Sequence, residues 1–240
     1  FSKSMQFKTE VYYQYLYNIP VEITPSSFSL LNQGSGFARF FPDTLQNTGT
    51  GSNMGIEFTL QKFFDNSFFF MTTVSLYDSK YYGSDGVLRN TDFNGNYILN
   101  GLAGKEFKLG KTDKHTMALG IKATYAGGKR YGYVDEVMTD SLKELVYLDS
   151  GYNSRRFTDY FRLDVKINYT LNTKKTTHEF GLDLVKVLPW WRENILGLTY
   201  TPSNDPLVPS YTERNQLGFL PIFYYKIDFK VAGKKAPPVE

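Results

Sequence analysis

The sequence contains no cysteine, and this absence removes several classes of chemistry. There is no disulfide framework, no thiolate metal site and no thiol nucleophile. The only histidines are His115 and His178, and no third ligand or carboxylate pair accompanies either of them in the sequence. No segment brings a nucleophile, a base and an orienting group together. We therefore expect no enzymatic activity, no catalytic residue, no metal site and no cofactor.

Long hydrophobic runs and dense charge are also missing. No apolar run approaches the roughly 18 residues of a membrane-spanning helix. The mean hydropathy is -0.37, and the net charge is only +3 for 240 residues. Without a dense basic run, nucleic acid is not an expected partner. The chain begins without a signal peptide, so either a signal was removed or the chain is a piece of a longer protein.

Aromatic residues, in contrast, are abundant: they make up 17% of the chain, with 19 Tyr and 20 Phe. A soluble core has little use for so much tyrosine, whereas amphipathic rings sit well at both interfaces of a membrane. Residues 221–229 show the clearest pattern. One face of this segment carries Phe223, Tyr225, Ile227 and Phe229, and the other carries Tyr224, Lys226 and Asp228. An apolar face ending in an aromatic residue is typical of a transmembrane β-barrel strand.

Similar alternation recurs in earlier segments, and helical periodicity is scarce. Eight strands are predicted, at residues 5–17, 53–63, 67–77, 97–107, 116–125, 160–169, 177–186 and 221–229. The alternation is clearest in residues 160–169. Leu163, Val165 and Ile167 oppose Arg162, Asp164 and Lys166. We expect the three apolar side chains, together with Phe223, Tyr225, Ile227 and Phe229, to face lipid.

The predicted connections alternate strictly between short and long. The short ones are residues 65–66, 108–114 and 172–176, and the long ones are 18–52, 78–96, 126–159 and 187–220. Outer-membrane barrels have short periplasmic turns and long extracellular loops, so this parity puts residue 229 in the periplasm. Residues 195–200 would break the parity as a full crossing, and we interpret them as one arm of a hairpin above the membrane. A soluble antiparallel sandwich is the alternative fold.

The long loops hold the candidate binding residues. Trp190, Trp191 and Arg192 could stack on a ligand such as a sugar or an aromatic compound, or could anchor an interface, and Tyr131 and Tyr133 join them as substrate-binding candidates. Residues 90–95 copy half of a calcium loop but lack its final glutamate, so we interpret them as a polar turn. Spacing over residues 134–146 predicts a short helix, with a capping box at residues 141–144 as an alternative start.

Several blocks resemble one family. They are SKYYGSDG at residues 79–86, NTDFNG at 90–95, AGKEF at 103–107, GGKRY at 127–131, DYFRLD at 159–164 and THEFGLDL at 177–184. With the last strand, they resemble the C-terminal barrel region of Bacteroidetes TonB-dependent outer-membrane receptors. The resemblance implies a 22-stranded barrel, closed by an N-terminal plug, that imports a nutrient ligand with energy passed through TonB.

On this resemblance, residues 1–229 are the last strands of an antiparallel transmembrane β-barrel in a Gram-negative outer membrane, and residues 230–240 are a periplasmic tail. The implied partners are outer-membrane lipid, TonB through a plug outside this sequence, and a surface lipoprotein or other outer-membrane subunits. Two features depart from the family: the tail after Phe229, and Lys186 to Trp191 in place of an Asn-containing turn. A structural subunit of an outer-membrane assembly therefore stays open, as does a complete eight-stranded barrel acting as an anchor or adhesin.

Overall fold

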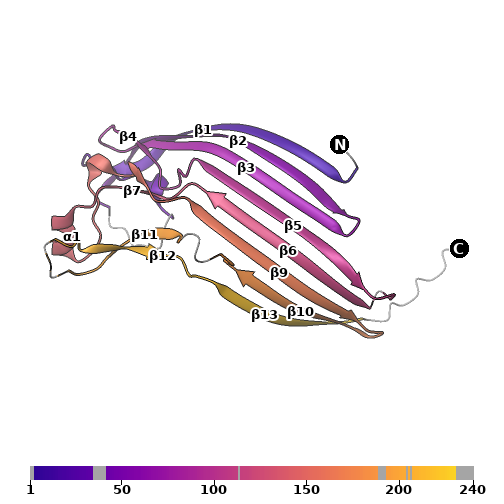
Figure 1. Cartoon of the computed structure of the whole chain (residues 1–240). Helices are drawn as coiled ribbons and strands as arrows, with labels where there is room; N and C mark the ends of the chain where they lie inside the picture. Colours follow the sequence, from indigo (N-terminus) through magenta and orange to yellow (C-terminus); the bar gives the residue numbers. More distant parts are fainter. Residues whose placement is uncertain are drawn as a thin grey trace.

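The structure is a computed structural model of the 240-residue chain and describes residues 3–34, 42–112, 114–188, 193–203, 205 and 207–230. Its main element is a nine-stranded antiparallel sheet, in which eight strands follow the order β1-β2-β3-β5-β6-β9-β10-β13 and the short β4 pairs with β3. Figure 1 shows these strands side by side in a single layer. The long strands are β1 (Met5–Glu22), β2 (Leu45–Asp65), β3 (Phe68–Tyr82), β5 (Tyr97–Leu109), β6 (His115–Ala126), β9 (Tyr160–Asn172), β10 (Thr176–Val185) and β13 (Leu220–Phe229).

The remaining elements are short and lie in the connections between the long strands. They are η1 (Leu30–Asn32), β4 (Leu88–Asn90), β7 (Arg130–Tyr131), α1 (Glu136–Leu142), η2 (Asp149–Gly151), β8 (Arg155–Arg156), β11 (Ile195–Tyr200) and β12 (Tyr211–Asn215). Within the described residues, no helix is long and apolar enough to cross a membrane.

The predicted antiparallel all-β fold is confirmed, and so are all eight predicted strands in their order. Residues 195–200 form β11, which pairs with β12 in a separate two-stranded sheet, as the parity of the connections predicts. The described residues form no sandwich of two packed sheets, because the two further sheets are two-stranded and lie in the connections.

The predicted first connection, residues 18–52, was too long. β1 continues to Glu22 and β2 already begins at Leu45, so both strands extend past the predicted ends. The register between them shifts around Ile19, and Asn18 has a φ of 56°. Glycines in the early part of β2 carry no hydropathy signal, yet a Cβ at Gly49 would lie 2.5 Å from Val21 Cγ1. The close pairing of these strand ends therefore depends on a residue without a side chain.

The register of the strands gives the sheet two different faces. Residues that are directly paired point to the same side, and the pairing links Val11 to Ile56, Ile56 to Leu76, Ile121 to Val165, and Leu182 to both Ile167 and Phe223. We call this the apolar face. The opposite polar face carries hydrogen-bonded pairs such as Ser75–Glu57, Thr124–Asn100 and Tyr224–Glu179.

The sheet is open. Among the described residues β1 pairs only with β2, and β13 pairs only with β10, so the two outer strands do not meet. These eight strands thus do not close on themselves into the complete eight-stranded barrel that the sequence left as an alternative. Two edges are left with unpaired backbone donors and acceptors along their outer sides.

The packed interior lies at one end of the sheet, not on either face. We call the described residues of 23–44, 83–96, 127–159 and 186–219 the loop layer, and the opposite end, with the connections after β2, β5 and β9, the turn end. The loop layer gathers on the left in Figure 1. The buried hydrophobic residues of the described chain are Val21, Tyr81 and Phe157, which lie in this layer or at the strand ends beside it. Asn94, Thr139 and Asn153 are also buried there.

A short helix forms in the loop after β6, as the spacing predicts, but the alternative start at residue 141 is wrong. The helix begins after Asp135, whose carboxylate accepts a 3.0 Å hydrogen bond from the Met138 amide. It ends at Leu142, followed by Lys143 with a φ of 58°. Residues 141–144 therefore close the helix, because an aspartate six residues earlier already caps its amino end.

Candidate functional site

The loop layer is joined by a buried arginine. The Arg89 guanidinium donates to both carboxylate oxygens of Asp85, at 2.8 and 2.5 Å, and to the backbone oxygen of Asp149 in the next long loop. The hydrogen bonds from Arg89 hold the pKa of Asp85 below its ordinary value. Because a bidentate pair fixes both position and orientation, Arg89 ties two connections into one unit.

Residues 90–95 form a second joint between the same loops. The Asn94 side chain is fully buried and donates to Asp78 and Asn90, each at 2.8 Å. The Asn153 side chain donates to the Asp92 carboxylate at 2.5 Å and to the Asn90 backbone oxygen at 3.0 Å. The predicted polar turn before β5 is present, and its side-chain oxygens bind neighbouring amides. In the part of the chain that the structure describes, no three His, Asp or Glu residues lie close enough to hold a metal ion.

A groove with a volume of about 530 Å³ opens between the β11–β12 hairpin and the segment that carries β7, β8 and α1. It is lined by Tyr131, Gly132, Tyr133, Val134, Glu136, Arg155, Phe157, Leu198, Tyr211, Thr212 and Glu213. These residues come from two loops, the connections after β6 and after β10. The groove exists only because both loops fold against the same end of the sheet.

Aromatic rings form one wall of the groove. Tyr131 stacks on Phe157 with ring centroids 4.1 Å apart and planes 13° from parallel. The Arg155 guanidinium lies 4.2 Å from the centre of the Tyr133 ring, in a cation–π contact. The antiparallel pairing of Tyr131 with Arg155 brings these side chains together across β7 and β8. The wall is thus pre-formed, with Phe157 buried beneath it and Tyr133 half exposed.

Charged groups of both signs surround the aromatic wall. Glu136 at the start of α1 and Glu213 on β12 line the groove together with Arg155. Nearby in the same loop, burial raises the pKa of Tyr147 to about 12, so this phenol stays neutral at physiological pH. The groove offers flat apolar surface, a guanidinium donor and two carboxylate acceptors. Such a site can hold a ligand by stacking and hydrogen bonding.

A smaller cavity of about 320 Å³ lies where the polar face meets the loop layer. Tyr12, Gln14, Asn53, Tyr77 and Ser79 line it from β1, β2 and β3, and Leu31, Thr91 and Phe93 line it from the loops. Polar side chains in its walls already hydrogen-bond to one another or to the backbone. The Ser79 hydroxyl donates to the Asn53 side chain at 2.6 Å, and the Tyr77 hydroxyl donates to the Phe93 backbone oxygen at 3.2 Å. We therefore take the larger groove as the candidate site.

The predicted site residues divide into three groups. Tyr131 and Tyr133 both line the groove. Trp190, Trp191 and Arg192 lie outside the described residues. The predicted lipid-facing residues Leu163, Val165, Ile167, Phe223, Tyr225, Ile227 and Phe229 all lie on the apolar face. Sequence reasoning missed Arg155, Phe157 and Tyr211, which are far from Tyr131 along the chain and belong to no local pattern.

The fold and the groove together define a class: a one-layer antiparallel sheet with an apolar and a polar face, capped at one end by packed loops that hold a binding groove. Comparison of the chain with protein-family models, with curated proteins and with solved structures gave no match.

Proposed function

We propose that this chain is the C-terminal portion of a transmembrane β-barrel of the Gram-negative outer membrane, and that the barrel is a TonB-dependent receptor for uptake of a nutrient ligand. The observation that carries the proposal is the apolar face, which continues across all eight long strands and is covered by no described element. Exposed apolar surface of this extent marks an interaction surface. Because both ends of this face carry aromatic rings, the surrounding phase that fits it is a lipid bilayer.

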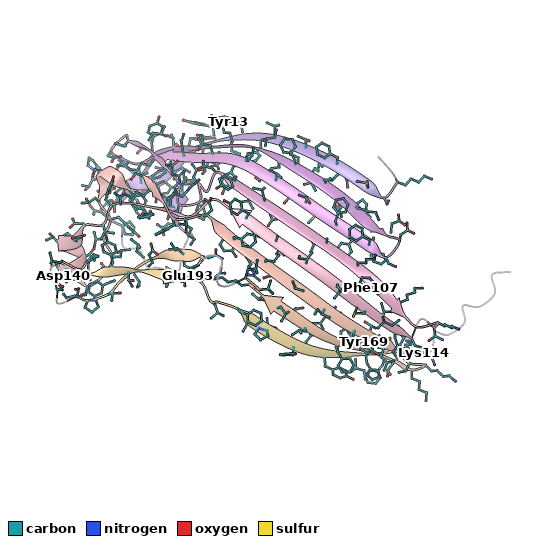
Figure 2. The ribbon with its side chains drawn as sticks, in the orientation of Figure 1. Tyr13, Phe107, Lys114, Asp140, Tyr169 and Glu193 are labelled. Carbon is teal, nitrogen blue, oxygen red and sulfur yellow. The ribbon has the colours of Figure 1, made fainter. Side chains whose placement is uncertain are left out.

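The aromatic residues support this interpretation by their positions. At the turn end, rings of neighbouring strands contact one another in a row: His115 with Tyr169, Tyr169 with Phe180, and Phe180 with Tyr225. At the loop end, Tyr97 stacks on Tyr125. Figure 2 shows Phe107 and Tyr169 near the turn end and Tyr13 toward the loop end. Such rows resemble the two aromatic girdles of a membrane barrel.

The height of the apolar face also fits a bilayer. Tyr97 and Phe107 mark its two ends on β5. At a rise of about 3.3 Å per residue, the distance between them along the strand is about 33 Å, which becomes about 25 Å across a membrane at a strand tilt of about 40°. An apolar band of about 25 Å is what outer-membrane barrels present to lipid.

The open edges support a larger barrel. Every unpaired backbone group costs several kcal/mol in lipid, so open edges are not tolerated within the hydrocarbon region. Strands outside these eight would pair with β1 and β13 and complete the wall. The resemblance to TonB-dependent receptors supplies the expected total of 22 strands, with a plug that contacts TonB.

The groove supports the ligand-binding part of the proposal. With the short connections in the periplasm, the loop layer lies outside the cell, where a nutrient is first met. The aromatic wall of Tyr131, Tyr133 and Phe157 and the charged side chains around it then form part of the outer ligand site.

A structural subunit of an outer-membrane assembly is the second candidate, favoured by the outermost part of the loop layer. Val137 on α1 is 79% exposed, and Leu207 in the hairpin loop is 91% exposed. Asp140 and Ser210 approach to 3.5 Å, so α1 and the hairpin loop lie together. A partner protein, such as a surface lipoprotein, would cover these apolar residues.

Cysteine labelling of the intact outer-membrane protein in cells tests the membrane proposal. Single cysteines at Val165, Lys166 and Tyr133 are compared with membrane-impermeant and lipid-soluble maleimides. We expect Tyr133→Cys to react with the impermeant reagent from outside, and Val165→Cys only with the lipid-soluble one. Equal reaction of Val165→Cys and Lys166→Cys with the impermeant reagent would contradict the lipid-facing assignment.

Binding of the intact protein to the periplasmic domain of TonB tests the transport part separately. Binding that is retained after purification supports the receptor. Correct membrane insertion without TonB binding favours the structural subunit.

A further inference from the structure

Two lysines stand out on the apolar face because they interrupt its apolar composition at one corner. Lys62 on β2 is paired with Phe70, and Lys105 on β5 is paired with Phe68, so both lysines share the face of these rings. Both lie near the turn end. Among the described strand residues of this corner, the only other charged one on the apolar face is Asp65, which pairs with Phe68 after a register shift.

The two lysines flank the same phenylalanine. The Lys62 ammonium is 5.6 Å from the centre of the Phe68 ring, and Lys105 is the direct cross-strand partner of Phe68. The Lys105 ammonium in turn lies 5.3 Å from the Phe107 ring centre. Aliphatic stems thus run along phenyl rings while the charged ends point toward the turn end, which is how lysines behave at a membrane boundary.

The charges of this corner do not cancel. Lys62 donates to the backbone oxygens of Asp65 and Phe68, at 2.9 and 3.3 Å, and lies 3.9 Å from the Asp65 carboxylate. Within the described residues, the Lys105 ammonium has a ring contact with Phe107 and no hydrogen-bonding or ion-pair partner. The ammonium groups of Lys62 and Lys105 and the single carboxylate of Asp65 leave one positive charge in excess. This charge lies next to the apolar face, which continues toward the loop layer.

Resting on the proposed membrane location, we infer that Lys62, Phe68 and Lys105 form a binding site for the phosphate of an anionic phospholipid in the leaflet at the turn end. The phosphate lies between the two ammonium groups, and the acyl chains lie on the aliphatic surface of β2, β3 and β5. A lysine on a lipid-facing strand costs several kcal/mol at mid-membrane but little at the interface, so this depth is where such residues are tolerated. The excess positive charge selects a headgroup with net negative charge.

The test uses the intact outer-membrane protein in nanodiscs of phosphatidylcholine with and without phosphatidylglycerol. The phosphatidylglycerol retained per protein after mild delipidation is measured by native mass spectrometry. The variants are Lys105→Gln, which leaves the turn contacts of Lys62 intact, and Lys62→Gln/Lys105→Gln. Lys105→Arg keeps the charge, and Lys166→Gln on the polar face is the matched control. We expect retention to fall about fivefold for each lysine removed, since a surface lysine contributes about 1 kcal/mol toward an anionic lipid.

The site inference fails if Lys105→Gln and the double variant retain as much phosphatidylglycerol as the unaltered protein, or if Lys166→Gln loses as much as Lys105→Gln. Retention by Lys105→Arg together with loss in Lys105→Gln supports it. Insertion is scored in the same samples by protection of the strands from protease. A protein that inserts normally but shows no lysine-dependent retention overturns the lipid site alone, whereas a protein that does not insert at all overturns the membrane proposal.

Discussion

At the scale of single residues, the two faces of the sheet place different demands on the side chains. On the polar face, charges are matched across strands: Lys166 lies 3.4 Å from Asp183 and 4.9 Å from the centre of the Tyr224 ring. The Tyr224 hydroxyl donates to Glu179 at 2.7 Å. Such cross-strand contacts satisfy polar groups on a partly enclosed surface. On the apolar face, no comparable partner is near the middle of the strands.

The first prediction compares an arginine on the apolar face with an arginine on the polar face, both near the middle of the strands. Val165→Arg on the apolar face of β9 should lower the free energy of unfolding by about 2–4 kcal/mol, because the charge enters the middle of the lipid-facing band. Leu102→Arg is the matched control, since Leu102 pairs with Lys122 and Lys122 pairs with Asp164, the neighbour of Val165. It lies on the polar face and should cost about 0.5 kcal/mol or less.

Denaturant titration of the intact protein folded into lipid vesicles measures both variants. Asp164 is a poorer control, because its carboxylate binds Arg162 at 2.8 Å and the Lys186 amide at 2.9 Å. If Leu102→Arg proves more costly than Val165→Arg, the assignment of the two faces is reversed.

The second prediction concerns the Asp85–Arg89 pair. Asp85→Asn should destabilise the loop layer by about 2 kcal/mol, the typical loss for a hydrogen bond to a charged group. The pKa of Asp85 is lowered in the folded state, so its contribution is fully present above the ordinary aspartate pKa. It is lost as the pH falls through the lower, folded value.

Hydrogen exchange of residues 83–95 measures this loss. In the unaltered protein, protection should fall only below the ordinary aspartate pKa, while in Asp85→Asn it should be low already at neutral pH. Asp140→Asn is the control, because Asp140 pairs with Lys143 at an exposed site where such pairs contribute little. Equal loss of protection in the two variants would contradict the inference that the Asp85–Arg89 pair stabilises the loop layer.

At the scale of elements, the β11–β12 hairpin is the part whose attachment is most localised. Asn194 at its base is buried, and its side chain pairs with Phe161 in both directions: the Asn194 amide donates to the Phe161 backbone oxygen at 2.7 Å, and the Phe161 amide donates back at 3.0 Å. The Asn194 side chain therefore exchanges two hydrogen bonds with the Phe161 backbone, as a residue of a paired strand would. These bonds hold one wall of the groove at the end of β9.

The third prediction follows from this attachment. Asn194→Ala should remove both hydrogen bonds to the Phe161 backbone and the 3.2 Å hydrogen bond to the Gln216 side chain, at a cost of about 1–3 kcal/mol. Hydrogen exchange should rise at Phe161 and through β11 and β12 while β9 and β10 stay protected. Asn215→Ala at the exposed side of the same hairpin base is the control and should change little. Uniform loss of protection over the whole sheet would contradict a local attachment of the hairpin through Asn194.

The elements differ in how far the sequence alone predicts them. β9 and β13 alternate so regularly that their faces are evident, because each residue type follows from its exposure to one of two environments. The parts of β1 and β2 nearest the loop layer were not predicted, since glycines and a register shift interrupt the alternation of apolar and polar residues there. The groove was found only through Tyr131 and Tyr133. Its other residues come together through contacts between two loops, such as Asp140 with Ser210, which no local spacing encodes.

At the scale of the whole molecule, packing and exposure are separated in space. The loop layer has the buried side chains and the dense hydrogen bonds of a soluble domain, while the long strands form one uncovered layer. In water such a sheet would expose its apolar face, because no described element covers it. On the proposed membrane location, stability comes from what surrounds the strands: lipid on one face and further strands at the edges.

The fourth prediction concerns those edges. Residues 1–240 expressed alone should not form a protease-resistant species in lipid vesicles, because the outer sides of β1 and β13 would place unpaired backbone groups in lipid. The intact protein should form one under the same conditions.

Disulfide crosslinking tests the same edges. The chain has no cysteine, so any disulfide must form between introduced cysteines. With Tyr224→Cys on β13, cysteines placed one at a time along β1 should give no disulfide in the intact protein, since on the receptor proposal further strands separate the two edges. Efficient crosslinking between β1 and β13, together with protease resistance of residues 1–240 alone, would make this chain a complete eight-stranded barrel and remove the receptor proposal.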